Sequence, residues 1–313
     1  MSRARGVRTN FAAAFESTYG TAPASGFVLL PYSRNDLDEE TGLNAEDTVG
    51  TRDPGDHTLD VNAIAGDITV PVDLRAFGNW LKATLGAPTT TEDTGVYTHV
   101  FESGAWAIPS FAGEKQLPDV PNYPMFGGCK VNQLQMAIQR GGLLNATVGV
   151  MGQSKTEATS TNAGTPTEYA LARFLQRQGA ISIDDSAVGN VVSAEFTYAN
   201  NLEAVETVTA DGNIGGLDEL QASLGVRLTV RFDSTTLLTK ATSGTPVDLD
   251  LTLTRGADES LAIAIPRLFL PVPKVTPIEG PAGIQATFDC MASRQANGDP
   301  MLTATLVNDV ESY

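Results

Sequence analysis

Short runs of alternating apolar and polar residues dominate the chain, a pattern typical of strands with one buried face. One run spans Val61–Leu74 around Gly66-Asp67, and Val131–Val150 contains two further runs joined by Arg140-Gly141-Gly142. Paired glycines at such a joint favour a tight turn between antiparallel strands. The pattern therefore predicts a mainly β protein in which a hairpin closes the first half of the sequence.

A matching hairpin is predicted near the end of the chain. Its strands are Ile284–Ser293 and Met301–Val307, and the segment between them is rich in Asn, Gly, Asp and Pro. These residues favour turns because they tolerate or pre-set the backbone angles that a turn requires. Each half of the chain is thus expected to end in an antiparallel pair.

Two segments have the spacing of a short amphipathic helix. In the first, Leu74, Phe77 and Leu81 lie on one stripe, and Gly86 follows as a stop signal. A weaker pattern spans Ser234–Thr242, whose first residue is suited to cap the first turn. We expect one short helix packed on a strand-rich body in each half.

The second half of the sequence repeats the first. Four segments recur in the same order, about 160 residues apart: Tyr32–Asp38 with Tyr198–Glu203, Ile68–Asp73 with Leu228–Asp233, Lys82–Gly86 with Lys240–Gly244, and Ala107–Pro109 with Ala264–Pro266. A repeat this long indicates a duplicated domain rather than a solenoid unit. We predict two tandem domains, residues 1–152 and 168–313, joined by a linker over 153–167 that is rich in Ser, Thr, Ala and Gly.

Two other long stretches lack a regular pattern. Leu43–His57 is dense in Asp, Gly and Thr, and Lys115–Gly128 contains Pro118, Pro121 and Pro124. Loops of this length without structure of their own usually make contacts or act as lids. We expect both stretches to be irregular contact segments.

The charge of the chain narrows the classes of partner. Its 20 basic and 37 acidic residues give a formal net charge of −17, which argues against binding nucleic acid by neutralising phosphates. An acidic surface can instead keep DNA mobile by repulsion, although acidity can also serve solubility alone. Charged residues make up 18% of the chain, below the usual level of about 25%, so we expect much of its surface to lie against neighbouring subunits.

The two cysteines and the N-terminus indicate the kind of compartment in which the protein is made. Cys129 and Cys290 lie in apolar, strand-like runs without Cys or His at metal-ligand spacing, and we interpret them as buried free thiols of a protein made in a reducing compartment. The basic segment Met1–Gly6 has no apolar run behind it, so no secretory signal is expected. No stretch approaches the roughly 20 apolar residues that span a bilayer, and we predict no membrane association.

Catalytic and metal-binding patterns are missing from the sequence. His57 and His99 have no local partners, which catalytic triads and most zinc sites need. Asp36–Glu40 and Asp248–Asp250 are rich in carboxylates but lack the glycine and downstream Glu of a calcium loop. We interpret the histidines as structural or exposed and the acidic runs as solvated surface. We expect no catalytic, cofactor-binding or metal-binding residues.

Motifs for nucleotide binding and ester hydrolysis are missing as well. Neither Gly-x-x-x-x-Gly-Lys-Ser/Thr nor Gly-x-Ser-x-Gly occurs. Aromatic residues make up 7% of the chain and are scattered, which provides no stacking platform for single-stranded nucleic acid. Trp80 and Trp106 are interpreted as anchors of the core or of an interface, with the core favoured. The chain is therefore predicted not to be an enzyme.

Several segments together resemble the major tail tube proteins of bacteriophages with long, non-contractile tails. The resemblance is carried by Asn10–Pro23, Gly66–Asp73, Phe77–Leu81, Leu85–Pro88, Val96–Phe101, Gly141–Val148, Gly283–Phe288 and Leu306–Asp309. These segments cover nearly the whole chain, and the likeness rests on their order rather than on any one motif. It implies a mainly β fold with two tandem tail-tube-like β-sandwich domains, each with one short flanking α-helix.

The resemblance also implies a function. Subunits of this family form rings that stack into a hollow tube, and each layer presents six domain copies, so two domains per chain imply a homotrimeric, pseudo-hexameric ring. The protein would be a structural part of the virion tail, assembled in the host cytoplasm, with other tail proteins at the tube ends. Genomic DNA would pass through an acidic lumen during ejection without specific binding. Leu43–His57 and Lys115–Gly128 are the expected ring-to-ring contacts.

Alternatives remain open at this point. A tail-terminator or capsid-decorating protein is also acidic and strand-rich, but a terminator caps a tube instead of extending it. A monomeric carbohydrate-binding β-sandwich would place Trp80, Trp106 or tyrosines in a groove. A hexameric ring stands beside the trimer that the repeat favours. Alternation defines two faces of a sheet without showing which is inside, so the sequence does not identify the carboxylates that would face the lumen.

Overall fold

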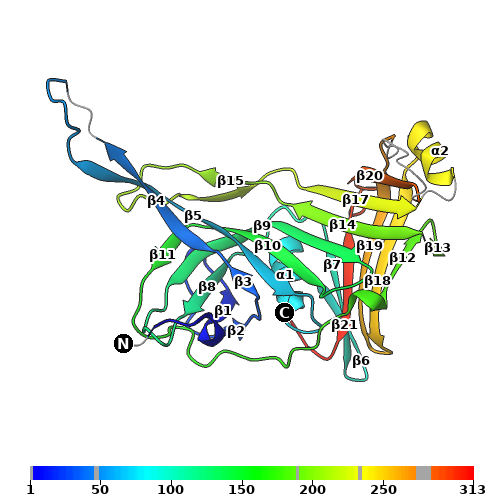
Figure 1. Cartoon of the computed structure of the whole chain (residues 1–313). Coiled ribbons are helices and arrows are strands. Elements are labelled where there is room, and N and C mark those ends of the chain that lie inside the picture. Colours follow the sequence, from blue (N-terminus) through cyan, green and yellow to red (C-terminus); the bar gives the residue numbers. More distant parts are fainter. Residues whose placement is uncertain (1–2, 46–48, 188–189, 232–234, 273–282) are drawn as a thin grey trace.

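The computed structural model describes residues 3–45, 49–187, 190–231, 235–272 and 283–313. Over these residues the fold is mainly β, as predicted, with two α-helices and two short 3-10 helices, η1 (Gly6–Arg8) and η2 (Gln176–Gln178). Most strands belong to one hydrogen-bonded network that bends into three connected sheets (Figure 1). Within the described ranges, no helix is long and apolar enough to cross a membrane.

Seven strands from both halves of the chain form one antiparallel sheet, here called the long sheet. Its order is β4 (Asp38–Ala45), β5 (His57–Pro71), β10 (Asn145–Gly152), β9 (Met125–Gln139), β14 (Val191–Ala199), β17 (Ser223–Arg231) and β20 (Gln285–Ala292). The short strand β3 (Arg34–Asn35) also pairs with β5. The pairing of β9 with β14 places Gln135 opposite Thr197, so the long sheet joins the two halves directly.

A second sheet also takes strands from both halves. Its order is β13 (Ser186–Ala187), β12 (Gly179–Ile183), β18 (Val247–Gly256), β19 (Glu259–Phe269), β21 (Thr303–Asn308), β7 (Val96–Glu102) and β6 (Thr89–Asp93). β21 lies in the middle, with Ala304 opposite Ile263 on one side and Phe101 on the other. The C-terminal strand therefore connects the two halves a second time.

The position of β21 shows that the predicted C-terminal hairpin is wrong. β20 lies in the long sheet and β21 in the second sheet, and the described residues of these strands do not pair with each other. β21 fills the gap between β7 and β19, each of which would otherwise expose an unpaired edge. By contrast, the predicted hairpin of β9 and β10 is confirmed, with Gln135 opposite Thr147.

A third sheet is built around the N-terminal strand. Its order is β2 (Val28–Leu29), β1 (Asn10–Phe15), β8 (Phe111–Gln116), the first part of β9, and β11 (Ser154–Thr156). β9 is long enough to take part in two sheets, because Met125 pairs with β8 and Gln139 pairs with β14. A separate hairpin, β15 (Leu202–Val205) with β16 (Gly216–Glu219), extends from the ends of β14 and β17.

Both predicted helices are confirmed. α1 (Phe77–Leu85) begins where the buried carboxylate of Asp73 accepts hydrogen bonds from three backbone N–H groups, and it ends at Gly86, whose φ of 108° suits glycine. It packs between β9 and β7, that is, between the long sheet and the second sheet. α2 (Thr236–Ser243) ends at Gly244 in the left-handed region. The predicted cap Ser234 lies outside the described residues.

The same order of elements recurs in the two halves. In the first half β5 leads into α1 and then into the pair β6 and β7; in the second half β17 leads into α2 and then into the pair β18 and β19. One apolar core, however, includes buried residues of both halves, such as Val148 and Leu228. Residues 153–167 are bonded to the first half, because β11 pairs with β9 and Thr167 donates its N–H to Phe27. The division at 152 and 168 stays a prediction.

Candidate assembly surfaces

The long sheet has one buried and one open face. On the buried face, alternate side chains such as Ile68, Val148 and Phe196 enter the core. The open face of the six strands from β5 to β20 is here called the polar face. It consists mainly of hydroxyl and amide side chains, with a few charges: Asp67, Thr69, Gln133, Gln135, Thr147, Glu195, Thr197, Arg227, Thr229, Arg231, Thr287 and Asp289.

Charges on the polar face are few and nearly balanced. Glu195, Arg227 and Asp289 lie in one row across β14, β17 and β20, and the Nε of Arg227 is 3.5 Å from an oxygen of Asp289. Glu195 also accepts a hydrogen bond from the amide of Gln135. With Asp67 and Arg231, the face carries three carboxylates and two guanidinium groups. It is a hydrated surface with a slight negative excess.

The strands β4 and β5 extend past the body of the molecule as a projecting hairpin (Figure 1). We call residues 40–45 and 49–61 the arm. Leu43, Leu59 and Val61 are at least 65% exposed there, and the described part of the arm carries four carboxylates against one guanidinium group: Glu40, Asp53, Asp56 and Asp60 against Arg52. A hairpin with exposed apolar side chains and no core of its own is typical of a contact segment.

The structure corrects the predicted conformation of both irregular stretches. In the first, Leu43–Ala45 and His57 are parts of strands, and residues 46–48 lie outside the described residues. In the second, Lys115 lies in β8, which ends at Gln116, and Met125 begins β9, so only a turn remains between these strands. Asp119 in this turn accepts hydrogen bonds from the guanidinium groups of Arg5 and Arg8. The turn is therefore fastened to the N-terminal segment.

The two tryptophans have different surroundings. Trp80 is 2% exposed, stacks on Phe11 at 6.4 Å between ring centroids and meets the edge of Phe111 at 5.9 Å. Its predicted place in the core is confirmed. Trp106 is 97% exposed, so the core assignment is wrong for this residue. It lies in a segment between β7 and β8 that forms no strand, where alternation could not predict burial.

The two histidines have different surroundings. His99 is fully buried, and its ring contacts the hydroxyl of Thr90 and the backbone carbonyl of Val310, each at 2.8 Å. Since a carbonyl only accepts, Nε2 carries the proton and Nδ1 accepts from Thr90. Burial lowers the pKa of His99, which keeps the ring neutral. His57 is exposed on the arm.

Both cysteines are buried free thiols, as predicted. Burial is the main cause that raises the pKa of Cys290 to about 12, and it also raises the pKa of Cys129 strongly. Because the thiolate is the reactive form, neither side chain is suited to nucleophilic or redox chemistry. They serve as small apolar residues of the core.

The two acidic runs have different surroundings: Asp36 and Asp38 are exposed, as predicted, whereas Asp248 and Asp250 are half-buried. Asp38 is bonded to Lys155 at 2.9 Å. Asp248 lies near Asp184 and Asp250, and burial together with these like charges raises its pKa. Over the described ranges, no group of three or more His, Cys, Asp or Glu side chains is arranged to hold a metal ion. The sequence predicted no catalytic, cofactor-binding or metal-binding residue. The candidate functional features of the structure are instead two surfaces, the polar face and the arm.

Comparison with known proteins also indicates a structural protein. No curated protein matches the chain. The sequence model of the family described as "phage tail tube protein" matches residues 6–292, which includes the long sheet, the arm and both helices. The chain therefore belongs to the phage tail tube protein family and is a structural component of the virion tail.

Proposed function

We propose that copies of this chain assemble into rings of three, and that these rings stack into a hollow tube through which DNA passes during ejection. The observation that carries the proposal is the long sheet, which runs through both halves of the chain and has a polar face. A wall of such sheets separates a hydrated lumen from an apolar core. The chain would be assembled in the host cytoplasm and meet other tail proteins at the ends of the tube.

Ring closure is supported by the two borders of the long sheet. Among the described residues, β4 pairs only with β5, and positions 286–290 of β20 pair only with β17. Each border leaves backbone groups free to bond with another strand. Side-by-side joining of chains through these borders would close the long sheets into a barrel, which removes the exposed edges.

The recurring order of elements supports three chains per layer. The first half contains the series β5, α1, β6 and β7. The second half contains the matching series β17, α2, β18 and β19. If each half takes an equivalent place, one chain fills two of six positions around the ring. The ring would then be pseudo-hexameric although it contains three chains.

The polar face is the proposed wall of the lumen. Threonine and glutamine side chains there hold water without attracting phosphates, and the slight excess of carboxylates adds weak repulsion. DNA would thus slide past a surface to which it does not bind. In this proposal the lumen is acidic, but the carboxylates that face it are few: Asp67, Glu195 and Asp289.

The arm and the turn at residues 117–124 are the proposed ring-to-ring contacts. Purified protein should form hollow, stacked rings in negative-stain electron microscopy, whereas a terminator would give single rings and a glycan-binding module would stay monomeric. Deleting residues 43–57, or separately shortening the turn, should leave soluble protein that no longer polymerises. Monomers of the wild-type chain under all conditions would contradict the proposal; normal tubes from both deletions would contradict the contact assignment alone.

A further inference from the structure

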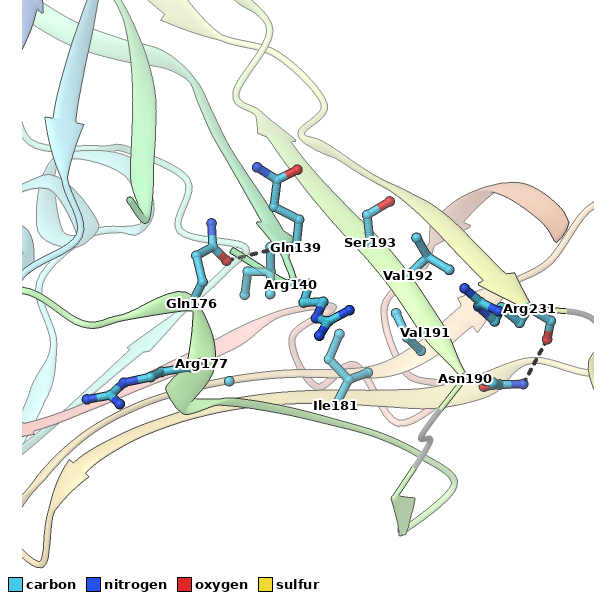
Figure 2. Close-up of a pocket in the computed structure, with 12 residues that line it drawn as sticks. Gln139, Arg140, Gln176, Arg177, Ile181, Asn190, Val191, Val192, Ser193 and Arg231 are labelled. Carbon is cyan, nitrogen blue, oxygen red and sulfur yellow. Dashed lines mark hydrogen bonds between the residues drawn. The ribbon is translucent and has the colours of Figure 1, made fainter. Parts of the chain in front are cut away.

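Three arginines line one open pocket of about 420 Å³. The pocket lies where β9 and β17 end and β14 begins, beside η2 and β12, and Arg140 lies between Arg177 and Arg231 in the close-up (Figure 2). Ile138, Ile181 and Val191 supply apolar lining, and the remaining polar lining consists of amide and hydroxyl groups. No Asp or Glu is among the described residues that line the pocket.

These three guanidinium groups differ from half of the basic residues of the chain. Arg5, Arg75, Lys130, Lys155 and six others form ion pairs within the chain, whereas Arg140, Arg177 and Arg231 form none with the described residues. In a chain of net charge −17, three arginines without an acidic partner in the described part of the chain create a local positive site. A guanidinium group binds a carboxylate through two parallel hydrogen bonds, so the pocket suits an acidic ligand.

The arm has the complementary composition. Its described part carries four carboxylates and the exposed apolar side chains of Leu43, Leu59 and Val61. Acidic groups on the arm match the arginines, and its apolar side chains match Ile181 and Val191 of the pocket. Both surfaces therefore combine charge with apolar area, which is typical of a specific contact between proteins.

Arm and pocket lie at opposite ends of the long sheet. β5 runs from His57 on the arm to Pro71, which pairs with Asn145 at the start of β10. The end of β9 and the start of β14, where Gln139 pairs with Ser193, lie at this same far end. One chain therefore cannot place its own arm in its own pocket. A contact between them joins two copies head to tail, and such a contact repeats without limit along a filament.

We propose that the arginine pocket receives the arm of a second copy of this chain in the next ring, where the guanidinium groups of Arg140, Arg177 and Arg231 bind carboxylates of that arm. This inference rests on the proposed stacking of rings and names the surface that the arm meets. Because the contact depends on exposed charges, it should weaken with salt. Wild-type tubes should shorten as the NaCl concentration rises from about 50 mM to about 500 mM.

Charge reversal tests the pairing in the full chain. The pocket variant Arg140→Glu/Arg177→Glu and the arm variant Asp53→Arg/Asp56→Arg should each fold and form rings but no tubes. The variant with all four substitutions should form tubes again, because opposite charges face each other once more. In a mixture of the two separate variants, like charges would meet only between rings of the same variant. Between unlike rings each arm would meet a pocket of opposite charge, so the mixture should form tubes in which the two kinds of ring alternate, although each variant alone forms none. Arg255→Glu is the control, since Arg255 is exposed and pairs only locally with Glu259.

The outcomes separate this inference from the proposed function. Tubes of normal length from the pocket variant would overturn the pocket, while rings and tubes of the wild-type chain would still support the proposed function. Single rings from the fourfold variant, with a circular-dichroism melt like that of the wild type, would overturn the arm as the ligand. Wild-type protein that forms no rings would contradict both.

Discussion

The guanidinium of Arg227 and the carboxylate of Asp289 face each other on neighbouring strands of the polar face, with Nε 3.5 Å from Oδ1. Both side chains are more than 60% exposed, so the pair stabilises the fold by no more than about 1 kcal/mol. Its larger effect is on charge, because it neutralises a carboxylate on the proposed lumen wall. The polar face can thus be tested by changing its charge without unfolding the protein.

Reversing charge on the polar face should make the tube retain DNA. The variant Asp67→Lys/Asp289→Lys turns the slight negative excess into a positive one, and lysines bind phosphates in a salt-dependent way. Short fluorescent duplexes should co-sediment with tubes of this variant at about 50 mM salt and be released at about 500 mM, since each phosphate contact weakens with salt. Wild-type tubes should release the duplexes at both concentrations.

The matched control places the same charge on the opposite sheet. Asp258→Lys changes an exposed residue in the turn between β18 and β19. If tubes with a lysine at position 258 retain as much DNA per added charge as those altered on the polar face, that face does not line the lumen.

An ion pair between β9 and β16 should contribute strongly to stability. The ammonium of Lys130 lies 2.7 Å from Glu219 and 2.9 Å from the carbonyl of Leu217, and Glu219 also accepts the N–H of Ile108. Glu219→Gln leaves the buried ammonium without its counter-charge, which should lower the free energy of unfolding by about 3 kcal/mol. Chemical denaturation measures this change. Glu259→Gln, which breaks the exposed pair with Arg255, should lower the free energy of unfolding by less than about 1 kcal/mol. Equal losses of stability in the two variants would contradict the strong contribution of the pair between Lys130 and Glu219.

The carboxylate of Glu219 also makes the stability of the fold depend on pH. Burial acts to raise the pKa of Glu219, but the bond to Lys130 and the N–H of Ile108 outweigh it, and the pKa is lowered. A carboxyl with a lowered pKa in the folded state adds stability above its ordinary pKa and loses it as the pH falls through the lowered value. The stability difference between wild type and Glu219→Gln should therefore shrink on acidification below about pH 4.5.

His99 should make the fold sensitive to mild acid. Its buried ring has a lowered pKa, so the unfolded chain binds a proton more readily than the folded chain does. Stability should then be complete above about pH 6.5 and fall as the pH drops toward the lowered pKa. Melting temperatures between pH 7 and pH 5 should decline less steeply for His99→Gln than for the wild type. His57→Gln, on the exposed arm, should leave the slope unchanged, and a flat wild-type profile would contradict the account.

Gly78 is required by the side chain of Tyr313. A methyl group at position 78 would overlap the Tyr313 ring, whose hydroxyl donates to the carbonyl of Arg75 and accepts from Asn308. Gly78→Ala should lower stability by about 1 to 3 kcal/mol, despite the better helix propensity of alanine, because the core has no room for the group. Gly141→Ala is the control, since a methyl there meets no atom within 4 Å; an equally stable Gly78→Ala protein would contradict the packing argument.

Local signals in the sequence predicted local structure well. Alternation located the strands around Ile68 and Val148, and the apolar stripe of Phe77 and Leu81 followed by Gly86 predicted α1. These features depend on neighbours within one or two turns of chain, so a single sequence contains them. The family resemblance, which covered most of the chain, agrees with the family match.

Features that depend on distant partners were not predictable in this way. A turn-rich segment before Met301 indicates a reversal, but the partners of β21 are β7 and β19, one of which lies about 200 residues away. Trp106 presents the opposite difficulty, since a large apolar side chain suggests burial although the folded chain leaves this one exposed. The arginine pocket joins residues from four separate segments, and no spacing in the sequence relates them.

The number of chains per layer shows whether one chain fills two of the six positions around the ring. Scanning transmission electron microscopy gives the mass per unit length of assembled tubes, and an axial projection gives the symmetry and the spacing of the rings. With a chain mass of 32.9 kDa, the account predicts hollow rings of three chains with six-fold pseudo-symmetry. A layer that contains six chains would contradict the claim that one chain fills two of the six positions.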